Sequence, residues 1–165
     1  MNIDIPQDSE PLTYVWGHMV PRIGRAAGAF ARAVAEQNTL GLYEFEAARI
    51  RIAQINGCLI CLHLRTARDG EKVDANFADE VERWESTDVL DERSKLAAEY
   101  AERFALDHHN LGDEFWDRMT THYSQVEIVE LTMCIGQWLA FGRLNHVLGV
   151  DRACMLPLQP ETSAN

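Results

Sequence analysis

The longest helical pattern in the chain lies between Ser124 and Gly149. It opens with Ser124-Gln-Val-Glu127, a capping box in which the serine and glutamate side chains each accept a backbone N–H at a helix start. Apolar or small residues then recur along one side at helical spacing, at Ile128, Leu131, Ile135, Trp138 and Gly142. The pattern therefore predicts a long helix that packs through this side and ends near Leu148.

Shorter helical patterns precede it, separated by turn residues. Asn56-Gly57 and Asp69-Gly70 are typical of helix ends, and Asp91 is a residue type that caps a helix start. The predicted helices cover residues 22–38, 43–55, 58–68, 75–85, a segment after Asp91 that includes Leu96, Tyr100 and Phe104, and residues 113–122. Strand-type alternation is hard to find. We therefore expect an all-α protein of about seven helices.

The length of the chain suits a single domain over residues 1–165. Pro6, Pro11 and Pro21 punctuate the beginning, so residues 1–20 are predicted to form an extended N-terminal arm. Residues 151–165 are predicted to form a C-terminal tail. The seven helices would lie between these two segments.

The charge of the chain argues against two classes of partner. The 165 residues carry a formal net charge of −11, which disfavours general binding to nucleic acid or to anionic membranes. No apolar run approaches the roughly 18 residues of a membrane span. The first ten residues carry acids where a signal peptide would carry basic residues. We therefore expect a cytoplasmic protein.

Two of the four cysteines, Cys58 and Cys61, form a C-x-x-C pair. If a helix starts near Cys58, then Cys61 and Arg65 follow on the same face, one turn and two turns later, while His63 points away. Backbone N–H groups at a helix start and a nearby guanidinium both stabilise a thiolate. A second cysteine within reach allows a sulfenic acid to be resolved as a disulfide. This stretch has the local chemistry of a redox-active dithiol.

Two other interpretations of the pair remain open at this point. Buried cysteines on a helix are often only small hydrophobic residues. A zinc site needs about four ligands, and the chain has neither a second C-x-x-C nor an H-x₃-H spacing. His63, His122 or the pair His108-His109 could serve as further zinc ligands only if the fold brought them to the cysteines. We expect no metal and no organic cofactor.

Three segments, in order, resemble the carboxymuconolactone decarboxylase and AhpD-like alkylhydroperoxidase superfamily. The first is Glu46-x₁₁-Cys58-x₂-Cys61, with Asn56-Gly57 just before the first cysteine. The others are D-V-L-D-E-R-S-K-L-A-A-E-Y-A-E-R-F and the long helix S-Q-V-E-I-V-E-L-T-M-C-I-G-Q-W-L-A-F-G-R-L-N-H-V-L-G-V. The resemblance covers about residues 42–150 and implies an AhpD-like helical domain.

The resemblance also implies roles for particular residues. In the AhpD-like branch the second cysteine attacks a peroxide and the first resolves it, so Cys61 would be peroxidatic and Cys58 resolving. Glu46 would belong to a proton relay, although a solvated helical glutamate is the alternative. The implied partners are an organic hydroperoxide substrate and an external dithiol reductant, of lipoyl type or a peroxiredoxin. The implied assembly is a homotrimer or homohexamer.

The chain departs from the family at two histidine positions. Arg65 stands where the relay histidine belongs, and Ile60 stands where another histidine precedes the second cysteine. Arginine holds its proton at all ordinary pH values and cannot relay it. If the helix after Gly57 folds back antiparallel, Arg65 would meet Glu46 beside Cys61, which makes Arg65 a fourth candidate site residue.

These observations predict a thiol-dependent hydroperoxide reductase, an antioxidant peroxidase of the AhpD type, or a related disulfide oxidoreductase. One alternative is a decarboxylase-like, lactone-handling enzyme in which the cysteines are incidental. The other is a non-catalytic, oligomeric redox sensor that kept the fold and lost the relay.

Overall fold

The computed structural model describes residues 3–150, and these residues form an all-α fold, as predicted. The α-helices are α1 (Pro21–Glu36), α2 (Leu42–Asn56), α3 (Leu59–His63), α4 (Phe77–Glu82), α5 (Glu92–Leu106), α6 (Asp113–His122) and α7 (Gln125–Leu148). A π-helical segment, η1 (Thr13–Met19), precedes α1, and a short 3₁₀ turn, η2 (His108–Asn110), precedes α6. The predicted C-terminal tail and Cys154 lie outside the described residues.

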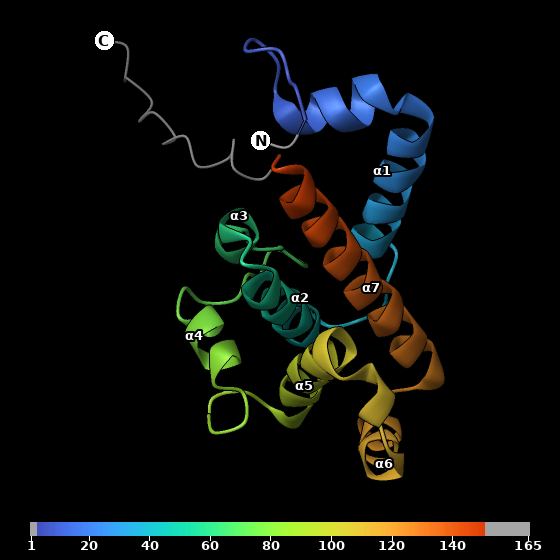
Figure 1. Cartoon of the computed structure of the whole chain (residues 1–165). Coiled ribbons are helices and arrows are strands. Elements are labelled where there is room, and N and C mark those ends of the chain that lie inside the picture. Colours follow the sequence, from blue (N-terminus) through green and yellow to red (C-terminus); the bar gives the residue numbers. More distant parts are fainter. Residues whose placement is uncertain (1–2, 151–165) are drawn as a thin grey trace, which may run out of the picture.

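Helix α2 lies at the centre and packs against α5 on one side and α7 on another (Figure 1). It is central because its apolar residues cover almost its whole circumference, so that it is buried on several sides. Its partners contribute the buried face of α5 and the predicted packing side of α7. The most completely buried large side chains include Phe45, Ile50, Ile52, Leu96, Met119, Leu131 and Ile135.

Most of the local signals at helix ends are confirmed, although Asp69-Gly70 ends no helix because α3 stops at His63. The Asp91 carboxylate accepts the Ser94 N–H at 2.8 Å at the start of α5. Ser124 and Glu127 form the predicted reciprocal capping box at the start of α7. Gly57 and Gly149 end α2 and α7 in the left-handed conformation, at φ 64° and 74°.

The prediction of an extended arm over residues 1–20 is wrong for its second half, which is helical. The Glu10 carboxylate accepts the N–H groups of Leu12 and Thr13, at 3.1 and 2.7 Å, and so caps the start of this segment. Pro11 and Pro21 stand at the beginnings of helical segments, where proline loses no hydrogen bond. Proline fits the first turn of a helix as well as extended chain, so these prolines are compatible with the helices that the structure shows.

The N-terminal segment packs closely on the rest of the fold, across one end of α7 (Figure 1). A Cβ atom on Gly24 would lie 1.8 Å from the Trp16 carbonyl oxygen, so only glycine allows this approach of η1 to α1. The Trp16 indole N–H donates to Asn145 Oδ1 of α7 at 3.0 Å, and its ring stacks on Phe141. These contacts fix η1 against α7.

No described helix is both long enough and apolar enough to span a bilayer.

Arg93 of α5 joins the first turns of α2 and α7. Its guanidinium donates to Glu44 and to Glu127, both at 2.7 Å, and these are the glutamates of the two capping boxes. It also donates to the His122 carbonyl and lies over the Tyr123 ring. The Ser124 N–H and then the Arg93 guanidinium lower the pKa of Glu127 below its ordinary value. The Arg93 side chain, at the start of α5, therefore joins the starts of α2 and α7 and the end of α6.

We expect Arg93→Gln to lower the free energy of unfolding by about 1–3 kcal/mol in urea at pH 7, because it removes charged hydrogen bonds from two partly buried carboxylates. Because the pKa of Glu127 is lowered in the folded state, its ionised carboxylate stabilises the fold. This stabilisation is fully present above the ordinary pKa of 4.5 and is lost as the pH falls through the lowered pKa. The difference between wild type and variant should therefore shrink in acid. Lys95→Gln, on the same helix, is the control and should change stability by less than about 0.5 kcal/mol. Equal effects of the two substitutions would contradict this role for Arg93.

Candidate functional site

The cysteine pair lies directly after the turn that ends α2. Gly57 reverses the chain, Cys58 is the N-cap residue of α3, and Cys61 follows within this short helix. The two cysteines are joined by a disulfide with a Cα–Cα distance of 5.3 Å, and the Cys61 N–H points at the Cys58 sulfur at 3.3 Å. The residues are therefore placed where a helix start can stabilise a thiolate on Cys58 once the disulfide is reduced.

Glu46 is fully buried on α2, so it is not the solvated helical glutamate considered as an alternative. Its partner is Arg49, one turn later. The Arg49 Nε and Nη2 groups donate to the two oxygens of Glu46 at 2.6 and 2.8 Å, in a bidentate pair that is almost wholly removed from water. Neighbours on α2 such as Ala47, Ala48 and Ile50 are fully buried, so this is an ion pair in the core.

Arg49 also holds the cysteine segment. Its guanidinium donates to the carbonyl oxygens of Cys61 and Leu64, both at 2.6 Å. In a continuing helix the Cys61 carbonyl would accept the N–H of Arg65 four residues later. Because Arg49 occupies it, the backbone turns to an extended conformation at Leu64, and α3 stops at His63.

The predicted helix over residues 58–68 is therefore wrong beyond His63, and the predicted contact between Glu46 and Arg65 is wrong with it. The Arg65 side chain folds back on its own turn and donates to the carbonyl oxygens of Leu62 and Leu64. Because the helix stops at His63, Arg65 does not lie on one helix face with Cys58 and Cys61, contrary to the prediction. The guanidinium beside Glu46 and the cysteine segment belongs to Arg49.

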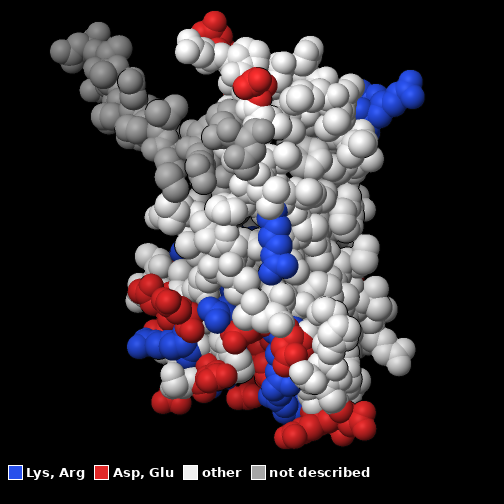
Figure 2. Space-filling model, in the orientation of Figure 1, with Lys and Arg blue, Asp and Glu red and all other residues white. Residues whose placement is uncertain are grey.

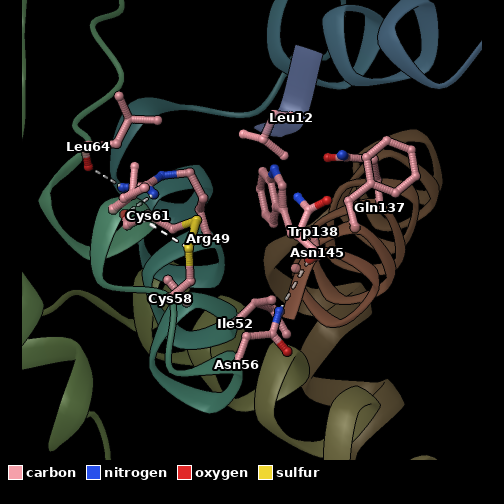
Figure 3. A pocket seen from close by; sticks show the side chains of 14 residues that line it. Leu12, Arg49, Ile52, Asn56, Cys58, Cys61, Leu64, Gln137, Trp138 and Asn145 are labelled. Carbon is pink, nitrogen blue, oxygen red and sulfur yellow. Dashed lines mark hydrogen bonds between the residues drawn. A yellow bond between two sulfur atoms is a disulfide. The ribbon is translucent and has the colours of Figure 1, made fainter. Parts of the chain in front are cut away.

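A cavity of about 320 Å³ opens on the disulfide. Figure 3 shows Arg49, Cys58 and Cys61 on one side of it, facing Trp138, Asn145 and Leu12 on the other. The remaining wall is mostly apolar and comes from the end of α2, from α3 and from the middle of α7; it includes Ile52, Ala53, Ile60, Leu64 and Phe141. The volume is at the lower end of the range for small-molecule sites.

The cavity depends on a close approach of α2 and α7 at its base. The Asn56 amide donates to the Trp138 carbonyl at 3.3 Å, and a Cβ atom on Gly142 would lie 2.3 Å from the Asn56 nitrogen. Gly142, predicted as part of the packing side of α7, is therefore the residue that admits Asn56.

The histidines considered as metal ligands do not gather at the disulfide. His63 is exposed, and its ring Nδ1 lies 2.7 Å from the Leu59 carbonyl oxygen. His108, His109 and His122 lie on the surface around α6. Among residues 3–150, no three His, Cys, Asp or Glu side chains lie close enough to share a metal ion. The remaining described cysteine, Cys134, is buried in α7, and burial raises the pKa of its thiol to about 12.

Sequence reasoning missed the second wall of the cavity. Trp138 is predicted as part of the packing side of α7, and no site role is predicted for Phe141 or Asn145, but all three line the cavity opposite the disulfide. A spacing of three and four residues between them on one helix face was the available signal, and it could not distinguish a cavity wall from a packed core. For Arg49 the signal was its position one turn after Glu46 in an apolar helix.

The comparisons with known proteins support the fold. No family model matches the chain. Over 122 residues it is 26% identical to the uncharacterized protein YdfG of Bacillus subtilis, covering 69% of this chain and 79% of that protein. It is 29% identical to an uncharacterized protein of Mycobacterium tuberculosis, covering 73% of this chain but only 43% of the relative.

A solved structure gives the clearer likeness. It is a protein of unknown function from Agrobacterium tumefaciens, proposed to be the antioxidant defence protein AhpD. It superimposes with a TM-score of 0.65 at 20% identity, over 81% of this chain and 92% of that one. The AhpD-like all-α fold predicted from the sequence is therefore confirmed.

We expect Arg49→Met to lower the free energy of unfolding by about 3–5 kcal/mol, because Glu46 would remain buried without its counter-charge. The double variant Glu46→Gln/Arg49→Met should recover part of this loss in urea titrations, since no charge is then left in the core. With the disulfide reduced, alkylation of the cysteine pair at pH 7 should be slower in the double variant than in wild type.

Arg65→Met is the matched control, because it removes a guanidinium from the segment just after the cysteines but not from the cavity wall. It should leave the alkylation rate close to that of wild type. If Arg65→Met slowed alkylation more than the double variant did, the cation that acts on the thiols would be Arg65.

Proposed function

We propose that the protein reduces hydroperoxides with the Cys58–Cys61 dithiol. The observation that carries the proposal is the position of both cysteines in the wall of a mostly apolar cavity, beside the guanidinium of Arg49. The AhpD-like fold adds support, since the solved neighbour is proposed to act in antioxidant defence.

The proposed reaction begins with the reduced pair. The Cys61 thiolate attacks the terminal, hydroxyl oxygen of the hydroperoxide, the O–O bond breaks, and Cys61 becomes a sulfenic acid while an alkoxide leaves. The alkoxide takes the proton of the Cys58 thiol and becomes an alcohol. The Cys58 thiolate then attacks the Cys61 sulfur, the S–O bond of the sulfenic acid breaks and the disulfide forms; the hydroxide that leaves becomes water by taking up from solvent the proton that Cys61 released when it ionised.

Arg49 would stabilise negative charge during these steps but would not transfer a proton. It is held by Glu46 and by two carbonyl groups, so it is fixed before the substrate binds. Such a preorganised cation stabilises a thiolate and a developing oxyanion without reorientation. The helix start favours a thiolate on Cys58, which suits its attack in the second step, and the assignment of the first attack to Cys61 rests on the resemblance to AhpD-like proteins.

The cycle requires an external dithiol that gives two electrons and two protons to the disulfide and is itself oxidised to a disulfide. Leu59, Ile60 and Leu64 are exposed hydrophobic residues on and just after α3. Ile60 and Leu64 also line the cavity on which the disulfide opens, so this apolar surface suits a lipoyl-type arm or the apolar surface of a peroxiredoxin-like partner.

The lactone-handling alternative fits the cavity less well. A reaction that takes a proton from carbon or water needs a general base near its substrate, most often His, Glu or Asp. Among the described residues that line the cavity, none is one of these three types. The proposed dithiol chemistry needs no such group, because the Cys58 thiol itself supplies the proton that the leaving alkoxide takes.

We expect wild-type protein to lose two thiols for each hydroperoxide consumed, with the loss of two hydrogens located by mass spectrometry in the peptide that holds Cys58 and Cys61. Cys134 is an internal control and should stay reduced, because it is buried and its pKa is raised. Cys58→Ser should still consume one equivalent of cumene hydroperoxide and give a trappable sulfenic acid on Cys61. Cys61→Ser should consume none. If only Cys61→Ser consumed the hydroperoxide, Cys58 would be the peroxidatic cysteine and Cys61 the resolving one. If neither variant consumed it, the peroxidase proposal would fail and the redox-sensor interpretation would remain.

We further propose that the chain assembles into homo-oligomers, as AhpD-like proteins do. The outer face of α7 presents a stripe of exposed apolar side chains at helical spacing, Val126, Val129, Met133 and Leu144. Such a stripe is commonly covered by a second copy.

Light scattering at micromolar concentration should give a mass of at least three times the 18.7 kDa of one chain. Val129→Lys/Met133→Lys should shift this mass toward that of one chain, because charges on the stripe must be desolvated in an interface. A wild-type mass near one chain would rule out the assembly.

A further inference from the structure

The cavity at the disulfide does not stand alone. A second hollow of about 360 Å³ adjoins it and shares Leu12, Phe141 and Asn145 as lining residues. A third, of about 380 Å³, adjoins the second and shares Trp16, Gly24 and Gly28 with it. The three hollows therefore follow one another from the disulfide, along η1, to the outer side of α1.

The chemistry of the walls changes along this path. Among the described residues that line the second hollow, none is charged, and α1 contributes only Gly24, Ala27, Gly28 and Ala31. An uncharged, mostly apolar passage suits a hydrocarbon chain, because it offers no partner for an ion. The small residues of α1 leave the space that such a chain would occupy.

The far end of the path carries positive charge. Arg25 and Arg32 line the third hollow, and a terminal nitrogen of Arg32 lies 3.9 Å from the position of a Cβ atom on Gly28. Both arginines are exposed, and neither forms an ion pair among residues 3–150. Two guanidinium groups without a carboxylate partner are well suited to bind one.

The surrounding charge distribution makes these arginines unusual. The whole chain has a net charge of −11, yet residues 11–35 hold three arginines and no Asp or Glu. The end of the molecule formed by α4, α5 and α6 carries most of the acidic side chains visible in Figure 2, whereas the end formed by η1 and α1 is mostly uncharged in that view. An anion would therefore be repelled least at α1.

We propose that the three hollows form one binding site for a long-chain fatty-acid hydroperoxide. The carboxylate binds Arg25 and Arg32, the hydrocarbon chain follows the passage beneath Leu12 and Trp16, and the peroxide group reaches the cysteine pair. This inference rests on the proposed function for the chemistry at the disulfide, but the binding of the fatty acyl chain does not depend on that chemistry.

Binding is tested first, with oleate and the oxidised protein, by titration calorimetry below the micellar concentration. Wild type should bind oleate at a defined stoichiometry, and Arg25→Gln/Arg32→Gln should weaken binding about tenfold or more, because charged hydrogen bonds to the carboxylate are lost. Gly28→Leu should also weaken binding, because its side chain enters the second and third hollows. A β-carbon at Gly28 meets no atom closer than 3.9 Å, and leucine favours the helix, so this variant should fold.

The matched control is Arg22→Gln, which removes an exposed arginine from α1 that lines none of the three hollows. It should bind oleate as wild type does. No binding by wild type, or equal binding by the control and the double variant, would overturn the proposal.

Kinetics then separate this inference from the proposed function. The ratio of kcat/KM for a hydroperoxide of linoleic acid to that for tert-butyl hydroperoxide should fall about tenfold or more in Arg25→Gln/Arg32→Gln, mainly through KM, and stay constant in Arg22→Gln. An unchanged ratio in the double variant would overturn the proposal. If oleate binds in the arginine-dependent way but no hydroperoxide is reduced, the binding site stands and the proposed peroxidase function fails.

Discussion

The buried ion pair between Glu46 and Arg49 determines the geometry of the candidate site. Two charges in a core are costly unless each is paired and fully hydrogen-bonded. Here the pair is bidentate, and Arg49 also donates to two carbonyl groups of the following segment. Those carbonyls are unavailable to a continuing helix, so α3 ends after one turn and Cys61 faces the cavity. Arg49 thus neutralises the buried charge of Glu46 and, through its remaining hydrogen bonds, positions the cysteine segment.

The position of α7 relative to α2 is the second constraint, and it is set at two places along these helices. At their first turns, Arg93 joins the capping glutamates Glu44 and Glu127. Toward their other ends, Asn56 lies against Gly142 and donates to the Trp138 carbonyl. Helices held at both places keep a fixed separation, and the space left between the end of α2 and the second half of α7 belongs to the cavity at the disulfide.

The parts of the fold that depend on neighbouring residues could be predicted from the sequence. The capping box at Ser124, the cap at Asp91 and the left-handed glycines Gly57 and Gly149 each act within a few residues, and all four are confirmed. The end of α3 could not be predicted in this way. Local pattern favours a helix to residue 68, and the competing hydrogen bonds come from Arg49, twelve to fifteen residues earlier in the chain.

The same limit explains the other errors. Pro11 and Pro21 begin helical segments, but proline fits both a helix start and extended chain, and the choice between them depends on packing of η1 against Asn145 and Phe141. Arg49 and Arg65 are both arginines near the cysteines, and only the tertiary fold decides which one reaches Glu46.

The N-terminal segment has a role distinct from that of the central helices. Helix α3 with its N-cap supplies the thiols, α2 supplies Arg49 and α7 supplies the aromatic wall, while Leu12 and Trp16 belong to a segment that packs across α7. Electrostatic interactions between exposed charges extend about 8 Å at physiological ionic strength, so the arginines of α1 would act on the proposed ligand only once it is at this end of the molecule. Residues 11–35 can therefore change the size and charge of an accepted ligand without altering the hydrogen bonds that hold the disulfide. In such an arrangement specificity and redox chemistry can vary independently, because different segments of the chain carry them.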